Sequence, residues 1–199
     1  MKTSIIHSNR VWSAVQKCIK GNIIPLGSKP SIGNMVDRLC YVNYRQWQLE
    51  DAARDSTLSA EKALELLRAI QSSNAERNKL WDLIDKAYLR RQRATLGAAG
   101  EQELECHETL GQLLDTLSVL YIRKYYIECQ IALGVKIHPI NKYTFSDAAS
   151  AIAGQIALVE RIFAKVEKLY LIGRVTLPLL NRFKLYAADL RNHVERRKQ

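Results

Sequence analysis

The feature that most constrains this fold is a long stretch without helix breakers, because residues 57–96 contain no Gly and no Pro. Thr57 or Ser59 is a suitable N-cap at its start. We therefore predict one helix from there to about Arg93, on the order of 50 Å long at 1.5 Å per residue. A kink at Ser72-Ser73 is the alternative. A single helix of this length favours a helical fold for the whole chain.

The remainder of the chain shows apolar residues at helical spacing, interrupted by loops that contain Gly and Pro. Further helices are predicted over residues 3–20, 33–55, 101–133 (starting at Glu101 or Glu105), 146–173 (with Ser146 as N-cap) and from Pro178 onward. No strand is convincing, and residues 135–140 are only a weak candidate. The predicted fold class is therefore all-α: a single antiparallel helical bundle of five to six helices, two of them long.

The bundle is predicted to be one domain over residues 1–199, with basic segments at both ends. Residues 1–34 form a basic N-terminal helix and loop, and residues 190–199 form a basic tail. The formal net charge of +10 admits nucleic acid, an anionic membrane surface or phosphorylated small molecules as partners. Solvated helix ends explain the same charge more simply, since cations suit helix C-termini.

Cysteine and histidine usage indicates a reduced protein without a metal centre. The four Cys residues are scattered and form no CxxC pair, which favours free thiols in the cytoplasm. The four His residues show no metal-binding spacing. The N-terminus lacks the apolar core of a signal peptide, and no segment is apolar for long enough to span a membrane. We therefore expect a cytoplasmic protein.

Charged and amide side chains interrupt the apolar stripes of three predicted helices. They are Asp51 and Arg54 in the second helix, Asn74 and Arg77 in the third, and Lys124 in the fourth. Buried charges cost free energy unless they are paired and hydrogen-bonded. If the stripes meet in one core, these groups either satisfy one another or face a cavity.

Three explanations of this pattern are open at this point. The groups could form a satisfied polar network that fixes the register of the helices, they could line a ligand pocket, or the helical phase could differ so that they face water. Arg54, Arg77 and Lys124 would together suit a phosphate or a carboxylate. General bases or magnesium ligands could come from the acidic residues Glu50, Asp51, Asp82, Asp85 and Asp115.

Four segments resemble a known family. Residues 47–54 (W-Q-L-E-D-A-A-R) resemble its W-H-L-E-D-x-x-R, and residues 67–85 resemble a stretch that contains N-Q-x-R-N-D. Residues 108–120 are similar to its E-S-x-G-x-L-I-D-R-L-S-I-L, and residues 182–187 to its closing F-K-x-Y-N segment. The family is the mainly bacterial, helical domain of unknown function 4254. Gln48 stands where the family has His, so an activity that used this His would be lost or altered here.

The resemblance implies no established activity, but members of the family often occur near functions in cell-surface polysaccharide synthesis and glycosyl transfer. Our first hypothesis is a helical protein that serves surface-glycan or lipopolysaccharide assembly, with a glycosyltransferase-type protein partner. Its polar pocket would bind a phosphorylated sugar or nucleotide sugar, without a cofactor other than an optional magnesium ion. The candidate pocket residues are Glu50, Asp51, Arg54, Asn74, Arg77, Asn78, Asp115, Lys124 and Lys184.

Two further hypotheses use the same residues differently. In the second, the protein is a non-catalytic interaction module that docks a protein partner, an anionic membrane surface or, less favoured, RNA through its basic ends. In the third, the polar groups only hold the core together. The sequence does not decide whether the protein is an enzyme.

Overall fold

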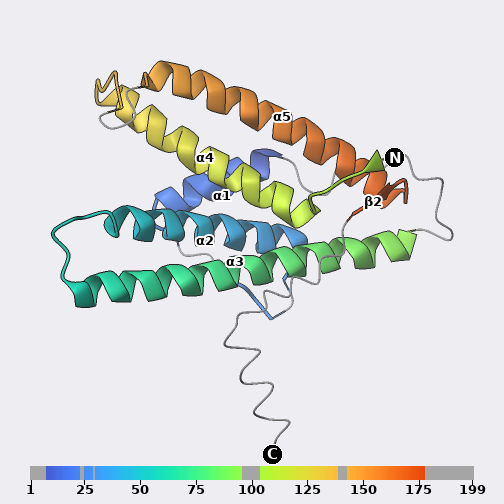
Figure 1. Ribbon diagram of the computed structural model, residues 1–199. Helices are drawn as coiled ribbons and strands as arrows, with labels where there is room; N and C mark the ends of the chain where they lie inside the picture. The colour runs from blue at the N-terminus through green and yellow to red at the C-terminus, as the bar shows by residue number, and fades with distance from the viewer. Residues whose placement is uncertain (1–7, 23–24, 29, 96–103, 139–142, 178–199) are drawn as a thin grey trace, which may run out of the picture.

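The computed structural model describes residues 8–22, 25–28, 30–95, 104–138 and 143–177 (Figure 1). Its elements are α1 (Ser8–Ile19), α2 (Ile32–Ala52), α3 (Ala60–Thr95), β1 (Leu104–Glu105), α4 (Leu110–Ala132), α5 (Phe145–Leu171) and β2 (Val175–Thr176). The predicted all-α helical bundle is confirmed. The predicted helix from Pro178 and the basic tail lie outside the described residues.

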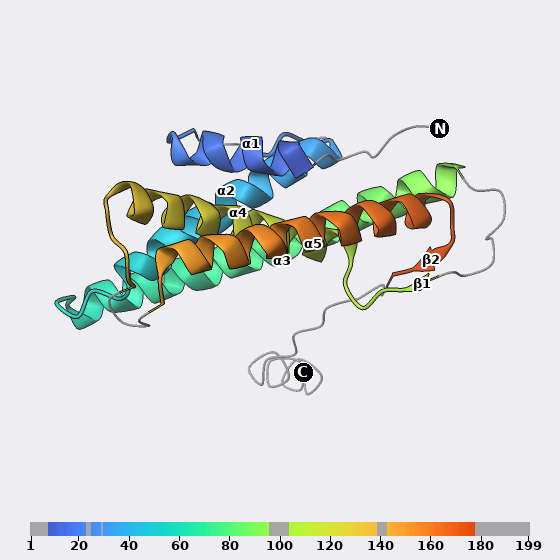
Figure 2. The same cartoon turned by 90° about the horizontal axis from the view of Figure 1, so that it is seen from above.

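The bundle consists of two helical hairpins and one additional helix. Helices α2 and α3 run antiparallel to each other, as do α4 and α5 (Figure 1). The α4–α5 pair lies across the α2–α3 pair, and α1 packs against α2 and α4 on the side away from α5 (Figure 2). This arrangement brings α2, α3 and α4 together in the middle of the molecule.

All five helices contribute to one apolar core. Val11 of α1, Leu39 of α2, Ile84 of α3, Leu117 of α4 and Phe163 of α5 are each at most 3% exposed. Burial of this apolar surface is the main force that holds the helices together. Among the described residues, no helix has the length and apolar character needed to cross a membrane.

Helix α3 is one continuous helix from Ala60 to Thr95 and runs through Ser72-Ser73 without interruption. Ser73 is buried, and its hydroxyl donates a 3.4 Å hydrogen bond to the carbonyl oxygen of Val42 in α2. The serine therefore packs against the neighbouring helix instead of interrupting its own.

Helix α4 begins later than predicted, since it starts at Leu110 and not at Glu101 or Glu105. Thr109 and Gln112 form a capping box at this end. The Thr109 hydroxyl accepts a hydrogen bond from the backbone N–H of Gln112 at 3.2 Å, and the side-chain oxygen of Gln112 accepts one from the backbone N–H of Thr109 at 2.7 Å. The cap satisfies two backbone donors that the first helical turn leaves unpaired.

One further helix boundary and one pair of strands differ from the sequence analysis. Thr144, and not Ser146, caps α5, because its hydroxyl accepts from the Asp147 amide at 3.1 Å. The short strands β1 and β2 form a parallel pair in the register of Leu104 with Val175, which the sequence analysis missed. Two residues of pairing are too few to produce a period-two pattern in a sequence.

Candidate functional site

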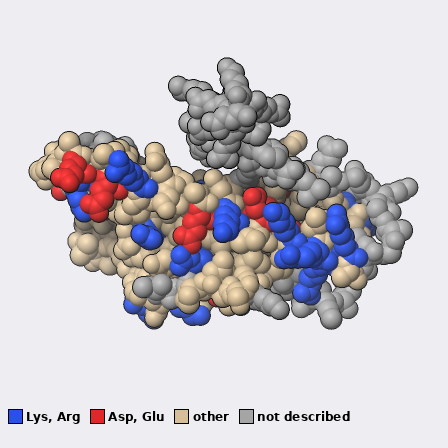
Figure 3. Space-filling view, turned by 90° about the horizontal axis from the view of Figure 1, so that it is seen from below, with Lys and Arg blue, Asp and Glu red and all other residues tan. Residues whose placement is uncertain are grey.

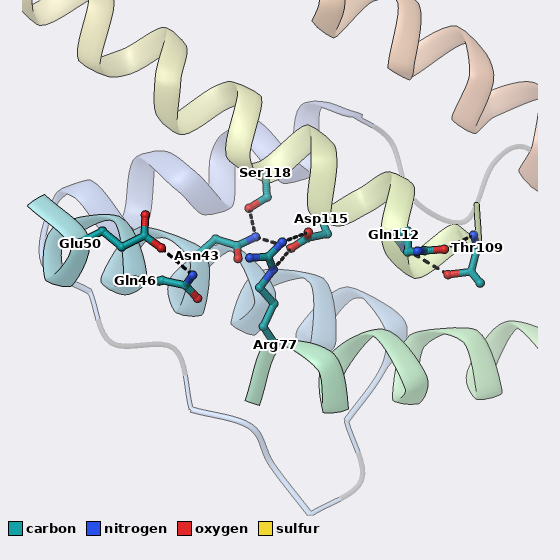
Figure 4. Close-up of polar contacts among 8 residues, drawn as sticks. All are labelled: Asn43, Gln46, Glu50, Arg77, Thr109, Gln112, Asp115 and Ser118. Atoms are coloured by element: carbon teal, nitrogen blue, oxygen red, sulfur yellow. Dashed lines mark hydrogen bonds and ion pairs between the residues drawn. The ribbon is translucent and has the colours of Figure 1, made fainter. Parts of the chain in front are cut away.

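A buried polar cluster lies where α2, α3 and α4 meet, and Asp115 of α4 is its centre (Figure 4). Arg77 of α3 donates to both carboxylate oxygens, from Nε to Oδ1 at 3.0 Å and from Nη2 to Oδ2 at 2.7 Å. Asn43 of α2 donates from Nδ2 to Asp115 Oδ1 at 2.7 Å. This bidentate pairing fixes the Arg77 guanidinium in one orientation.

The same contacts fix the side-chain amide of Asn43. Its Nδ2 also donates to Ser118 Oγ at 2.8 Å. Because an ionised carboxylate can only accept hydrogen bonds, the nitrogen of Asn43 must face Asp115, and the oxygen must point elsewhere. Asn43 is 4% exposed, and its Oδ1 has no hydrogen-bond partner among the described residues.

A second fixed amide lies one turn further along α2. Gln46 donates from Nε2 to Glu50 Oε1 at 2.8 Å, so its nitrogen is held by a carboxylate in the same way. Gln46 is 7% exposed, and its Oε1 also lacks a partner within the described part of the chain. A buried acceptor that stays unsatisfied costs about 1–3 kcal/mol. Both oxygens are closed off from solvent, so neither is open to a ligand in this structure.

Both amides line a pocket of about 240 Å³. Helix α2 provides Trp47 and Glu50 in addition to the amides, and α3 provides Arg77. The wall from α4 is apolar apart from one cation. The lining residues are Asn43, Gln46, Trp47, Glu50, Arg77, Val119, Ile122 and Arg123. The pocket thus combines hydrogen-bond acceptors, guanidinium groups and apolar surface.

The three helices that form this pocket lie in the region that matches a protein-family model. The model of the family described as "Protein of unknown function (DUF4254)" matches residues 33–133, just over half of the 199 residues. The chain belongs to the DUF4254 family. The resemblance to this family is thereby confirmed over residues 33–133, the region that contains α2, α3 and α4. Comparisons with curated proteins and with solved structures gave no match.

Three of the predicted site residues lie at or beside this pocket. Glu50 and Arg77 line the pocket, and Asp115 holds Arg77 in place. Asn74 and Asn78 are partly buried on α3 but do not line this pocket. The polar network and the pocket are adjacent, since Asp115 pairs with Arg77 at the pocket wall.

Asp51 and Arg54 were predicted wrongly as pocket residues. Their side chains are 71% and 73% exposed and approach each other at 3.8 Å on the surface. Helix α2 ends at Ala52, so the helical spacing that seemed to align Arg54 with the core no longer applies there. For this pair, the alternative in which the groups face water is the correct one.

Lys124 is also placed differently from the prediction. Its ammonium lies 5.0 Å from the ring centre of Trp12 in α1 and 3.6 Å from Glu128, outside the pocket. Arg123, the preceding residue, lines the pocket instead. One residue is a rotation of about 100° around a helix. Lys184 lies outside the described residues.

The sequence analysis missed Asn43, Gln46 and Trp47 as pocket residues, although the first two carried a readable signal. Asn43, Gln46 and Glu50 are spaced i, i+3 and i+7 and therefore share one face of α2. Uncharged amides on an otherwise apolar helix face stand out less in a sequence than charged side chains do.

The remaining candidate groups are the predicted acids, metal-ligand clusters and two buried thiols. The described residues contain no group of three or more His, Cys, Asp or Glu side chains that could hold a metal ion. Asp85, one of the predicted acids, accepts a hydrogen bond from the Gly111 amide at 2.8 Å. Burial, with a further contribution from Asp37, raises the pKa of the Cys18 thiol to about 11. Burial also raises the pKa of Cys40, so neither is a nucleophilic thiolate at neutral pH.

Proposed function

We propose that this DUF4254 protein binds a phosphorylated sugar or nucleotide sugar in the pocket between α2, α3 and α4. The observation that carries the proposal is that two guanidinium groups, one carboxylate and apolar side chains line one small pocket. The role that we propose for this binding is in surface-glycan or lipopolysaccharide assembly in the cytoplasm, alongside a glycosyltransferase-type partner.

Two arginines of different character supply the positive charge. Arg77 is already paired with Asp115, so its charge is largely compensated, and Nη1 is the nitrogen that Asp115 does not hold. Arg123 is exposed and forms no ion pair with an acid within the described ranges. Guanidinium groups bind phosphate oxygens in a bidentate manner. Arg123 is therefore the residue that we assign to the phosphate, with Arg77 as a rigid second donor.

The other walls suit a sugar. Hydroxyl groups of a sugar can donate to the carboxylate of Glu50 at the pocket wall. The Trp47 ring and the apolar side chains of Val119 and Ile122 can cover the C–H face of the ring. A few fixed polar groups within apolar walls are the usual composition of small-molecule sites.

Glu50 is the pocket residue on which a catalytic step after ligand binding would depend. It is the one acidic side chain among the described residues that line the pocket. Gln46 holds its Oε1, which orients the carboxylate along α2. If the bound sugar is processed, Glu50 is our candidate for the general base, because it lies within reach of the ligand hydroxyls.

The proposal is tested by thermal shift and calorimetry with sugar phosphates, nucleotide sugars, plain nucleotides and short RNA. A ligand at about 100 times its Kd stabilises a protein by roughly 2.7 kcal/mol. For a domain of this size, this raises the melting temperature by a few degrees. We expect such a shift with sugar phosphates or nucleotide sugars only.

The matched variants for this experiment are Arg123→Gln and Arg161→Gln. Both remove one positive charge, but Arg161 is exposed on α5 and does not line the pocket. We expect Arg123→Gln to weaken binding of the phosphorylated ligand by about tenfold, the factor for one lost charged hydrogen bond. Unchanged binding by Arg123→Gln, or no stabilisation by any small molecule, would refute the proposal.

One observation favours the interaction module as a second candidate. Figure 3 shows Lys and Arg side chains gathered toward one end of the α3 face, where Lys86, Arg90, Arg91 and Arg93 are exposed. Electrostatic binding to RNA or to anionic lipid vesicles would weaken steeply as salt increases. It would also survive Arg123→Gln and fail in an Arg90→Gln, Arg93→Gln double variant. A flat salt response argues against this module.

A further inference from the structure

We infer that the exposed side of α5 docks this protein on an anionic lipid bilayer, with its cations at the headgroups and its apolar side chains at the edge of the acyl layer. This inference rests on the second candidate function, the interaction module, and moves the contact from the basic end of α3 to α5. It does not depend on the pocket between α2, α3 and α4, so vesicle binding and sugar-phosphate binding fail separately.

The first observation is that α5 has an outer side that no other described helix covers. Figure 2 shows α5 along the front of the bundle, with the other helices behind or beside it. The inner side of α5 is in the core, where Ile156, Phe163 and Tyr170 are at most 7% exposed. The outer side of a surface helix normally carries charged and polar residues.

The outer side of α5 instead exposes large apolar side chains. Leu158 is 49% exposed, Ile162 is 37% exposed, and Ile172 at the C-cap is 45% exposed. Together with Lys165 and Leu169 they are spaced i, i+4, i+7, i+11 and i+14, which places all five on one side of the helix. Other exposed positions of α5 carry only a methyl group or a hydrogen atom: Ala151, Ala153, Gly154, Ala157 and Ala164. An exposed apolar stripe with polar residues at its rim is typical of an interaction site.

The second observation is that cations accompany this stripe. Arg161, Lys165 and Lys168 are exposed, and none of them forms an ion pair within the part of the chain that the structure describes. Cations suit the last turn of a helix, which accounts for Lys168. The same effect does not account for Arg161 and Lys165, because it falls off within that turn.

No acid compensates these cations on the outer side. Residues 150–171 contain two acids, Glu160 and Glu167. Tyr121 of α4 donates a hydrogen bond to Glu160 at 2.5 Å, and Tyr88 of α3 donates one to Glu167 at 2.5 Å, so both carboxylates are bound within the bundle. The outer side of α5 is therefore complementary in charge to an anionic surface.

Two of these cations also line a pocket at the C-terminal end of α5. The pocket has a volume of about 450 Å³ and is lined by Lys165, Lys168, Leu169, Ile172 and Arg174. Because three of its lining residues are cations and none is an acid, the pocket suits an anionic headgroup. Its two apolar side chains are placed to contact the part of the lipid next to that headgroup.

A bilayer fits these observations better than RNA or a second copy of the chain. Proteins that bind single-stranded RNA stack its bases on aromatic rings, whereas the exposed positions within residues 150–171 include no aromatic residue. A second copy would bring the same uncompensated cations to the interface, and like charges repel. A helix with cations beside Leu and Ile is typical of helices that lie on anionic lipid.

The test is cosedimentation of the full chain with lipid vesicles. One set contains equal parts of phosphatidylglycerol and phosphatidylcholine, and the other contains phosphatidylcholine alone. We expect the wild type to bind the anionic vesicles and not the zwitterionic ones, and we expect this binding to weaken as salt increases.

The charge variants are a Lys165→Gln, Lys168→Gln double variant and an Arg90→Gln, Arg93→Gln double variant. Each removes two positive charges, from α5 in the first and from α3 in the second. We expect the α5 variant to bind anionic vesicles at least about tenfold more weakly, since each Lys near such a surface contributes a factor of about five. The α3 variant should stay within about threefold of the wild type, because charges away from the contact are screened.

The apolar variants are Leu158→Gln and Leu64→Gln. They are closely matched, because Leu158 is 49% and Leu64 46% exposed and each lies within a helix, where glutamine is well accepted. We expect Leu158→Gln to weaken vesicle binding by about fivefold and Leu64→Gln to leave it unchanged. Both variants should melt at the temperature of the wild type, since neither side chain is in the core.

Several results would overturn the inference. They are equal losses in the two charge variants, no loss in Leu158→Gln, or absence of vesicle binding by a wild type that binds short RNA or dimerises. A loss confined to the Arg90→Gln, Arg93→Gln double variant also overturns it, but leaves the interaction module in place on α3. Sugar-phosphate binding is measured on the same proteins and should be the same in all of them.

Discussion

Asp115 carries a negative charge into the interior of the bundle, where two neighbouring helices provide its partners. Its side chain is 6% exposed, whereas that of Arg77 is 25% exposed. A buried ion pair adds little net stability compared with well-packed apolar residues, but removing one partner leaves a charge without compensation. The pair is therefore best understood as the element that holds Arg77 and Asn43 in one orientation beside the pocket.

Replacement of this residue is expected to be costly. Asp115→Ala should lower the free energy of unfolding by about 3 kcal/mol, the lower part of the range for breaking a buried pair, since water reaches part of Arg77. Urea denaturation measures this change. Asp51→Ala is the control, and its change should stay within about 0.5 kcal/mol because that carboxylate is on the surface. Similar losses in both variants would contradict our description of the cluster.

The residue scale is also where sequence prediction was least accurate. Glu50, Arg77 and Asp115 were predicted at the site, but Lys124 was chosen in place of Arg123. The reason is physical: a helical phase error of one residue rotates a side chain by about 100°, which decides between the pocket and the Trp12 ring. Apolar periodicity constrains the phase of a helix only to within such an error.

At the scale of elements, the sequence predicted helix type well and helix ends less well. The continuous helix α3 could be predicted because its sequence contains neither Gly nor Pro, the residues that most disfavour a helix. The start of α4 was placed too early, although Thr109 and Gln112 have the spacing of a capping box. The strand pair escaped prediction because β1 and β2 find each other only through tertiary structure.

The contact between α3 and α4 depends on one glycine. A Cβ atom at Gly111 would lie 2.9 Å from the carbonyl oxygen of Trp81 and 3.0 Å from its Cα. Both are backbone atoms, so the helices would have to move apart to accept a side chain. The close approach also allows the Gly111 amide to donate to Asp85.

We expect Gly111→Ala to destabilise the protein by about 1–3 kcal/mol, because overpacking of the helix contact outweighs the better helix propensity of alanine. Gly154→Ala is the matched control: it lies within α5, and a Cβ atom there would meet nothing within 4 Å. That variant should be stabilised by up to about 1 kcal/mol. Chemical denaturation of the two variants checks both signs, and a stabilised Gly111→Ala would show that the helix contact is looser than described.

At the scale of the whole molecule, the fold class could be predicted from the sequence and the arrangement could not. Helical periodicity is local, but the site depends on pairs that are far apart in the chain. Asn43 and Asp115 are 72 residues apart, and Arg38 pairs with Glu76 across α2 and α3 at 2.6 Å. Which helices lie side by side is decided by the sum of such contacts, and this sum has no signature in any single segment.

The measurement that tests the central claim most directly is an NMR titration of the wild type with the sugar phosphates. It follows the backbone amide signals along the chain, together with the side-chain amide signals of Asn43, Gln46, Asn74 and Asn78. We predict saturable shifts at Asn43 and Gln46, which line the pocket, and little change at Asn74 and Asn78, which do not. Shifts confined to the basic end of α3, or no saturable shift at the two pocket amides, would contradict the account.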